Sequence, residues 1–180
     1  MNVRPFPAPA QALLEELHAS LRLKAHLAVV HEAVCTLMER LTAEWPMLEY
    51  DADAVRLGAA IHDIGKVIHP EELSEPGHAH EKAGQQLLLQ KGWPEAAARF
   101  AMTHADWNAP DSQLEDLLVA LADKIWKGKR DGDLEQALTQ LIHKCSGEQL
   151  WDVWLRLDDI LSAIAEGSDE CLVWQAEYDV

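Results

Sequence analysis

The sequence predicts an all-α, single-domain helical bundle, and three observations support that prediction. Apolar residues recur at helical spacing along most of the chain, beginning with Leu13, Leu14, Leu17 and Leu21. No stretch shows the sustained apolar-polar alternation that is typical of a half-buried strand. A chain of 180 residues suits one domain, which can bury roughly 70% of its unfolded surface. We therefore expect one domain over residues 10–180, preceded by an extended, proline-rich arm over residues 1–9.

Helix start and stop signals divide this domain into successive segments. The periodicity predicts one long helix or two consecutive helices over residues 10–45, ended by Pro46. Asp51 or Asp53 is suited to cap the next helix, which is expected to stop at Gly65. Further helices are expected over residues 79–90, 94–104, 112–127, 134–144 and 148–166, with a long and potentially functional loop over residues 67–77.

Composition and charge restrict the classes of partner. The formal net charge of −16 disfavours long nucleic acids, because their binding depends on Lys and Arg side chains that neutralise phosphates. A local cationic pocket is still compatible with a small phosphorylated ligand. No apolar run approaches the roughly 18 residues of a membrane span, and the N-terminus lacks the apolar segment of a secretory signal. We therefore expect no membrane partner and a cytoplasmic location, in which Cys35, Cys145 and Cys171 are reduced.

One of the most apolar stretches of the chain contains an adjacent imidazole and carboxylate. Leu57, Ile61 and Ile64 recur at helical spacing, and His62 and Asp63 lie between the last two of them. A buried polar group without a partner costs roughly 2–7 kcal/mol. The pair must therefore be hydrogen-bonded, as an ordinary buried His-Asp pair would be, or bound to a metal ion.

Other imidazoles and carboxylates fall on separate predicted helices or at their edges. They are His31, His80, His104 and Asp123. Imidazole nitrogen and carboxylate oxygen are suitable ligands for Mn, Fe, Co, Ni or Zn, and a helical bundle can gather such groups in its core. The sequence therefore favours a metal site that several helices share.

This pattern resembles the HD superfamily of metal-dependent phosphohydrolases, which is named for the adjacent His and Asp. The residues that carry the resemblance are His31, the string His62-Asp63-Ile64-Gly65-Lys66, and Asp123 in Ala122-Asp123-Lys124. The resemblance covers about residues 20–130 and leaves the helices of residues 131–180 outside it. It implies an all-α bundle in which His31, His62, Asp63 and Asp123 bind a divalent transition metal ion. His80 and His104 resemble the positions that bind a second ion in some branches, where the Asp of the pair bridges both ions.

Two pairs of histidines compete for positions in this ligand set. His26 and His31 cannot share one helix face, because five residues place them about 140° apart. We select His31, because its spacing to the His-Asp pair better fits the family. We select His80 over His78, because the glycine at Gly84 suits the family pattern.

The resemblance implies hydrolysis of a phosphoester by metal-activated water. The expected substrate is a small phosphorylated compound, in particular a nucleotide, and the expected catalytic residues are Asp63 and Lys66. Lys66 is also expected to hold phosphate, and Trp107 to stack on a base or line the pocket. A basic cluster after Asp123 could complete the substrate site, or could be an ordinary solvated helix end; it comprises Lys127, Lys129 and Arg130.

Three other functions remain open. The first is a diiron oxygenase, because some HD proteins with this extended ligand set use iron and oxygen. The others are a catalytically silent metal- or nucleotide-binding regulatory module and a purely structural bundle. Most of the seven tryptophans, among them Trp45, Trp126, Trp151 and Trp154, are expected in the core or at an interface, which leaves room for a homodimer.

Overall fold

The computed structural model describes residues 3–178, and its regular structure over this range is helical, without strands. Residues 1–2 of the expected arm and residues 179–180 lie outside the described range. The elements are α1 (Ala8–Glu16), α2 (Leu21–Glu44), α3 (Ala52–Ile61), η1 (Ile64–Val67), η2 (Pro70–Leu73), α4 (Ala79–Gln90), α5 (Glu95–Ala98), α6 (Phe100–Thr103), α7 (Leu114–Ile125), α8 (Gly132–Ser146), α9 (Leu150–Ala165) and α10 (Ser168–Ala176). The predicted all-α class is confirmed.

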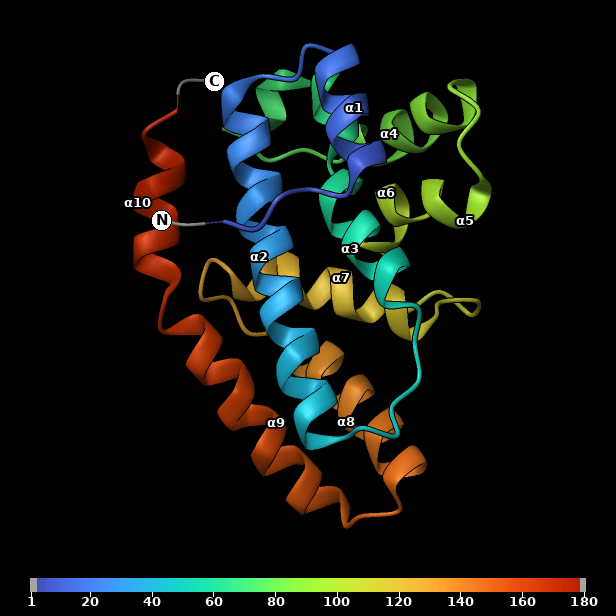
Figure 1. The fold of residues 1–180 in the computed structure, drawn as a ribbon, viewed down its shortest axis with the longest axis vertical. Coiled ribbons are helices and arrows are strands. Elements are labelled where there is room, and N and C mark those ends of the chain that lie inside the picture. The colour runs from blue at the N-terminus through green and yellow to red at the C-terminus, as the bar shows by residue number, and fades with distance from the viewer. Residues whose placement is uncertain (1–2, 179–180) are drawn as a thin grey trace.

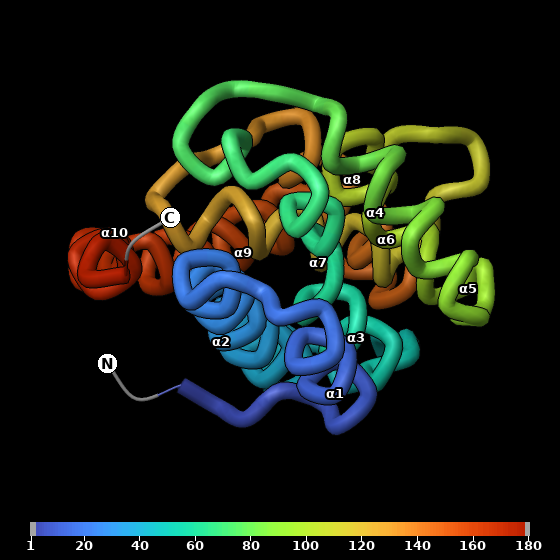
Figure 2. Tube along the Cα trace, turned by 90° about the horizontal axis from the view of Figure 1, so that it is seen from above, coloured from blue at the N-terminus to red at the C-terminus, as the bar shows by residue number. Residues whose placement is uncertain are grey.

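The long helix α2 is the centre of the bundle, and α3 and α7 pack directly against it (Figure 1). Ser20 begins α2, because its hydroxyl accepts a hydrogen bond from the Leu23 N–H at 3.2 Å. Of the two alternatives for residues 10–45, two consecutive helices are found. The C-terminal helix α10 lies beside α2 in two perpendicular views (Figures 1 and 2).

The segment that precedes the His-Asp pair is fixed at both ends. The Asp51 carboxylate caps α3, accepting hydrogen bonds from the N–H groups of Asp53 at 3.1 Å and Ala54 at 2.9 Å. The α-helix ends at Ile61, four residues before the expected stop at Gly65, and the 3₁₀ helix η1 follows. His62 and Asp63 therefore occupy the turn between two helical segments.

A close backbone approach joins this turn to α4. A Cβ atom on Gly65 would overlap the carbonyl oxygen of His80 and come within 2.6 Å of the Gly84 nitrogen. Gly84 is equally confined, since its own Cβ would lie 3.0 Å from the Gly65 nitrogen. These two glycines let η1 and α4 touch, and this contact brings His80 next to Asp63.

We expect Gly65→Ala to destabilise the protein by about 1–3 kcal/mol, the usual cost of overpacking, because backbone atoms cannot yield as a flexible side chain would. Equilibrium unfolding in urea measures the change. Gly132→Ala is the matched control, because a Cβ at Gly132 meets nothing within 4 Å. Equal stability of the two variants would contradict the close approach.

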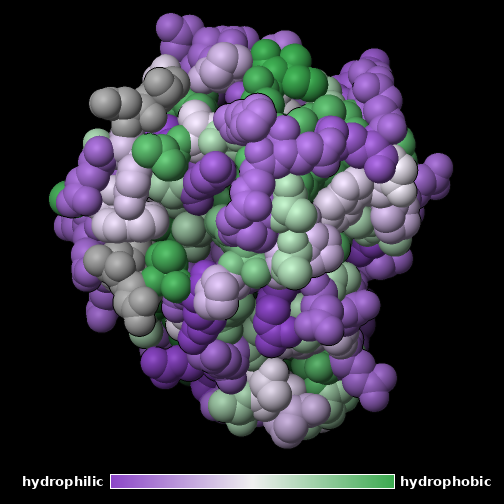
Figure 3. All heavy atoms as spheres, turned by 45° about the horizontal axis from the view of Figure 1, so that its top comes forward, coloured by the Kyte–Doolittle hydropathy of each residue, from purple (hydrophilic) through white to green (hydrophobic). Residues whose placement is uncertain are grey.

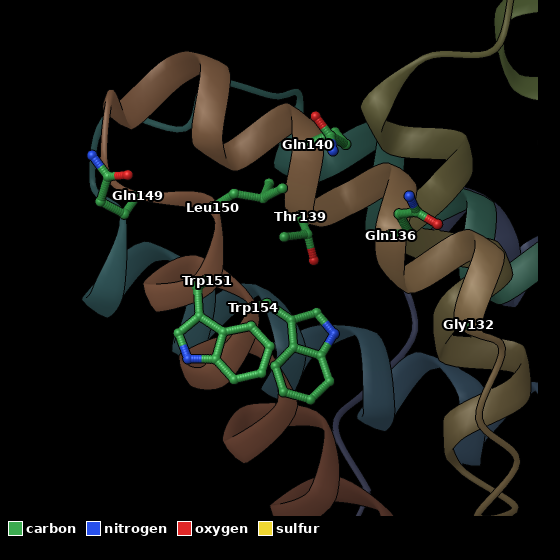
Figure 4. A pocket seen from close by; sticks show the side chains of 8 residues that line it. All are labelled: Gly132, Gln136, Thr139, Gln140, Gln149, Leu150, Trp151 and Trp154. Carbon is green, nitrogen blue, oxygen red and sulfur yellow. The ribbon is translucent and has the colours of Figure 1, made fainter.

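The tryptophans divide between core and surface. Trp45 and Trp126 are buried, as predicted. Trp151 and Trp154 are 65% and 40% exposed, so of the two expected locations the core is excluded for them and the interface stays a prediction. Their rings stack with centroids 5.0 Å apart on one wall of a groove of about 540 Å³ between α8 and α9 (Figure 4).

The remaining surface is mostly polar on the face seen in Figure 3, where apolar residues appear as small separate groups. This agrees with the strong negative charge of the chain. Within residues 3–178, no helix combines the length and the apolar character that crossing a bilayer requires. Cys35, Cys145 and Cys171 form no disulfide.

Candidate metal centre

Imidazole and carboxylate groups from five parts of the chain converge in the interior of the bundle. They are His26 on α2, His62 and Asp63 after α3, His80 on α4, His104 after α6, and Asp123 on α7. All of these residues except Asp123 are buried, and the Asp123 side chain is 20% exposed. Among the described residues, they form two groups whose ligand atoms lie within 4.8 Å of one another: His26 with His62 and Asp123, and Asp63 with His80 and His104.

Asp63 links the two groups, because each of its oxygens faces one of them. Oδ2 lies 2.8 Å from Nε2 of His26 and 3.6 Å from Nε2 of His62. Oδ1 lies 2.9 Å from Nε2 of His80 and 3.4 Å from Nε2 of His104. This is the arrangement that a carboxylate bridging two ions requires.

Hydrogen bonds at Nδ1 orient three of the rings so that Nε2 faces the centre. The Nδ1 atom of His62 lies 3.0 Å from the Ala59 carbonyl oxygen, and that of His104 lies 3.1 Å from the Phe100 carbonyl oxygen. In His80, Nδ1 instead lies 2.5 Å from a carboxylate oxygen of Glu72. Bonds of this kind fix the tautomer in which Nε2 carries the free lone pair.

The inward-facing nitrogens lie against carboxylate oxygens without well-formed hydrogen bonds. Nε2 of His26, His62 and His80 is buried, and the nearest oxygen of Asp63 lies 2.8, 3.6 and 2.9 Å away, respectively, in a geometry that does not meet hydrogen-bond criteria within the described structure. A buried polar atom without a partner carries a free-energy cost, and a bound cation would remove it. Four imidazoles and two carboxylates therefore fit one or two divalent transition metal ions.

The charge states of these groups also suit cation binding. Burial lowers the pKa of His26, and burial together with the neighbouring His62 lowers the pKa of His104 to about 4, so both rings are neutral at pH 7. Burial alone would raise the pKa of Asp63, but the surrounding histidines outweigh it and hold the pKa well below its usual range. For Asp123, attraction to His62 and Lys127 likewise outweighs burial and lowers the pKa. Burial alone would lower the pKa of His80, but hydrogen bonds and attraction to Asp63 and Glu72 outweigh it and raise the pKa, so a metal ion would have to displace a proton from this ring. Neutral imidazoles and ionised carboxylates are the forms that bind metals.

The structure corrects one residue of the predicted ligand set: His26, and not His31, belongs to the cluster. The His31 ring is turned to another face of α2, where its Nε2 lies 3.8 Å from the Cys35 sulfur and its ring meets Phe6 edge-on at 5.7 Å. The two histidines do point to different faces, as expected, but spacing along the chain selected the wrong one. Of the other competing pair, His80 lies in the cluster, whereas the side chain of His78 is 90% exposed.

His31 should make stability sensitive to acid. Burial, aided by Arg56 and Arg4, lowers its pKa from 6.5 to about 4, so the unfolded chain binds a proton at a pH where the folded protein does not. The resulting contribution to stability is present above pH 6.5 and is lost as the pH falls towards 4. When the pH is lowered from 7 to 5, the unfolding free energy of His31→Gln should fall by about 2 kcal/mol less than that of the wild type. Urea denaturation at the two pH values measures this difference. An unchanged pH dependence would contradict this assignment.

Of the residues expected to bind substrate, some lie beside the cluster and others do not. The Lys66 Nζ lies 2.6 Å from Asp63 Oδ2, and the Lys127 Nζ lies 3.3 Å from Asp123 Oδ2, so both cations border the cluster. Trp107 is partly buried against the core, and Lys129 is exposed. The guanidinium of Arg130 is not brought to the centre, because it bonds Glu135, Asp158 and Ser162 on α8 and α9.

Glu72 was missed as an individual residue, although the acidic loop that contains it was expected to be functional. Its carboxylate accepts hydrogen bonds from the backbone N–H groups of Ala79 and His80 as well as from the His80 ring. These bonds outweigh the effect of burial and lower the pKa of Glu72 to about 2. Only the fold brings these groups together, because the sequence shows merely one glutamate among several in a loop.

Comparison with known proteins gives one match. The family model described as HD domain matches residues 26–126, which is more than half of the chain. The matched range begins at His26 and includes all six residues of the cluster. No curated protein and no solved structure matches the chain.

Proposed function

The chain belongs to the HD-domain family, and from this premise we propose that it is a metal-dependent phosphohydrolase that cleaves a phosphoester bond in a small phosphorylated compound. The HD domain implies the superfamily of metal-dependent phosphohydrolases, and a nucleotide is the substrate class that we put forward. The observation that carries the proposal is Asp63, whose two oxygens each face one cluster of possible metal ligands. Two ions held on the two sides of Asp63 would act as Lewis acids that activate water and offset charge on phosphoryl oxygens.

The side chains of the protein have separate roles in this proposal. The six clustered residues would hold the ions, with His26, His62 and Asp123 on one side of Asp63 and His80 and His104 on the other. Lys66 and Lys127, which already lie beside the two carboxylates, would attract and orient the phosphate. The buried position of the cluster limits the access of bulk water and so strengthens these electrostatic interactions.

Metal removal followed by reconstitution tests the proposal. Purified protein is analysed for metals by mass spectrometry, stripped with a chelator, and reloaded with Mn²⁺, Fe²⁺, Co²⁺, Ni²⁺ or Zn²⁺. Phosphate release from a panel of nucleotides and other phosphoesters should vanish after stripping and return on reloading. Oxygen consumption with substrate by the iron form would instead favour the diiron oxygenase, and metal binding without turnover would favour a regulatory module. A fully folded protein that binds no metal would reject the phosphohydrolase, the oxygenase and a metal-binding regulatory module.

A further inference from the structure

We propose that Glu72 is a positioning residue that holds His80 in place for a second metal ion. The inference rests on the proposed metal-dependent function and deepens it, because it separates the determinants of the two ions. Glu72 lies on η2, outside the six clustered residues, and its side chain is 8% exposed.

The contacts of Glu72 tie the loop before α4 to the start of that helix. Oε1 accepts a hydrogen bond from the Ala79 N–H at 3.0 Å, and Oε2 accepts one from the His80 N–H at 3.1 Å. His78, which precedes α4, makes no capping hydrogen bond with its side chain. Glu72 therefore supplies the acceptors that the first turn of α4 needs, and it fixes the backbone that carries His80.

The same carboxylate also sets the His80 ring. Its Oε2 lies 2.5 Å from Nδ1, which leaves Nε2 as the lone-pair nitrogen, 2.9 Å from Asp63 Oδ1. His62 and His104 are oriented by backbone carbonyls, whereas His80 is oriented by a charged group. A carboxylate partner makes an imidazole a stronger ligand. Removing this charge should therefore weaken the group of Asp63, His80 and His104 and spare the group of His26, His62 and Asp123.

The loop is shaped to accept this carboxylate. A Cβ atom on Gly77 would overlap Oε1 of Glu72. Gly77 has no side chain at the point where the loop passes the buried carboxylate, and this lets Glu72 reach the N-terminus of α4. Gly77→Ala is therefore a second way to displace the Glu72 carboxylate, and it does so without removing the charge.

Glu72→Gln and its neighbour Glu71→Gln form a matched pair for testing the inference. Glu71 is exposed, and its side chain contacts the ring of His69, on the loop. Metal-free protein is titrated with Co²⁺ alone, and binding is followed by calorimetry and by the visible spectrum of the bound ion. The wild type and Glu71→Gln should each bind two ions per chain. Glu72→Gln should bind the first ion with unchanged affinity and the second 10- to 100-fold more weakly.

Further measurements keep the outcomes distinct. Circular dichroism of the metal-free variants shows whether they fold, and Gly77→Ala should reproduce the selective weakening if Glu72→Gln does not fold. An equal second affinity in wild type and a folded Glu72 variant would overturn the inference and leave the proposed function intact. Binding of a single ion by the wild type would also overturn it, while a metal-dependent activity could still stand. Binding of no ion by the folded wild type would reject both.

Discussion

Replacing Asp63 by Ala should lower phosphoester hydrolysis at least ~100-fold and remove at least one of the two metal ions that we propose. The group of His80 and His104 would retain two imidazoles without a carboxylate, which is too few ligands to hold an ion firmly. The other group would keep His26, His62 and Asp123, and so a weakened site for the first ion. Metal content per chain, measured by mass spectrometry, should fall from two to one or below. Because loss of a single electrostatic group in other active sites costs about 10²- to 10³-fold in rate, we expect at least that loss of phosphate release.

The control for this change is Asp53→Ala, because the Asp53 carboxylate is 96% exposed and pairs only with Arg56 among the ion pairs of the described chain. This variant should keep both ions and full activity. Removing the buried carboxylate leaves the ammonium group of Lys66 without its partner at 2.6 Å and should lower stability, so circular dichroism is needed to establish that Asp63→Ala is folded. A folded Asp63→Ala protein with unchanged metal content and activity would reject the bridging role.

His80, Asp123 and the His-Asp pair of this centre could be predicted from the sequence. The 3.6-residue periodicity placed Asp123 and His80 on amphipathic helices, and the His-Asp pair stood out because it interrupts an apolar stretch. The fold class followed from the same periodicity. Each of these residues has a local signal in the sequence, either helical spacing of apolar residues around it or an adjacent polar residue. Such a signal can be read without knowing the tertiary contacts.

Tertiary contacts decided the rest, and the upstream histidine shows why. Residues 45–51 form an irregular connection between the end of α2 and the start of α3, and they run back in the direction opposite to α2 (Figure 1). Extended chain advances about 3.3 Å per residue and helix only 1.5 Å, so sequence distance does not give the level on α2 that faces His62. Glu72 illustrates a second limit, because its role depends on a hydrogen bond across a loop to His80. Neither a turn count nor an apolar pattern contains that information.

Replacing each of the two histidines of α2 by Gln in turn tests the corrected ligand set. In His26→Gln, the first group loses a ligand atom that lies 2.8 Å from Asp63 Oδ2 and 3.7 Å from Asp123 Oδ1. We expect the loss of one ion per chain and a fall in phosphate release of about 10²-fold or more, since the phosphoryl charge would lose part of its compensation.

His31→Gln is the matched control, because the substitution is the same, the helix is the same and both residues are buried. Nε2 of His31 faces the sulfur of Cys35, so this variant should retain two ions and wild-type activity at pH 7.5, where the ring it lacks would be neutral. Metal analysis and phosphate release on both proteins decide between the two residues. Loss of metal in His31→Gln together with retention in His26→Gln would restore the assignment that chain spacing favoured. The opposite result would place the first ion between α2, the turn after α3 and α7, where the imidazoles of His26 and His62 lie 5.5 Å apart.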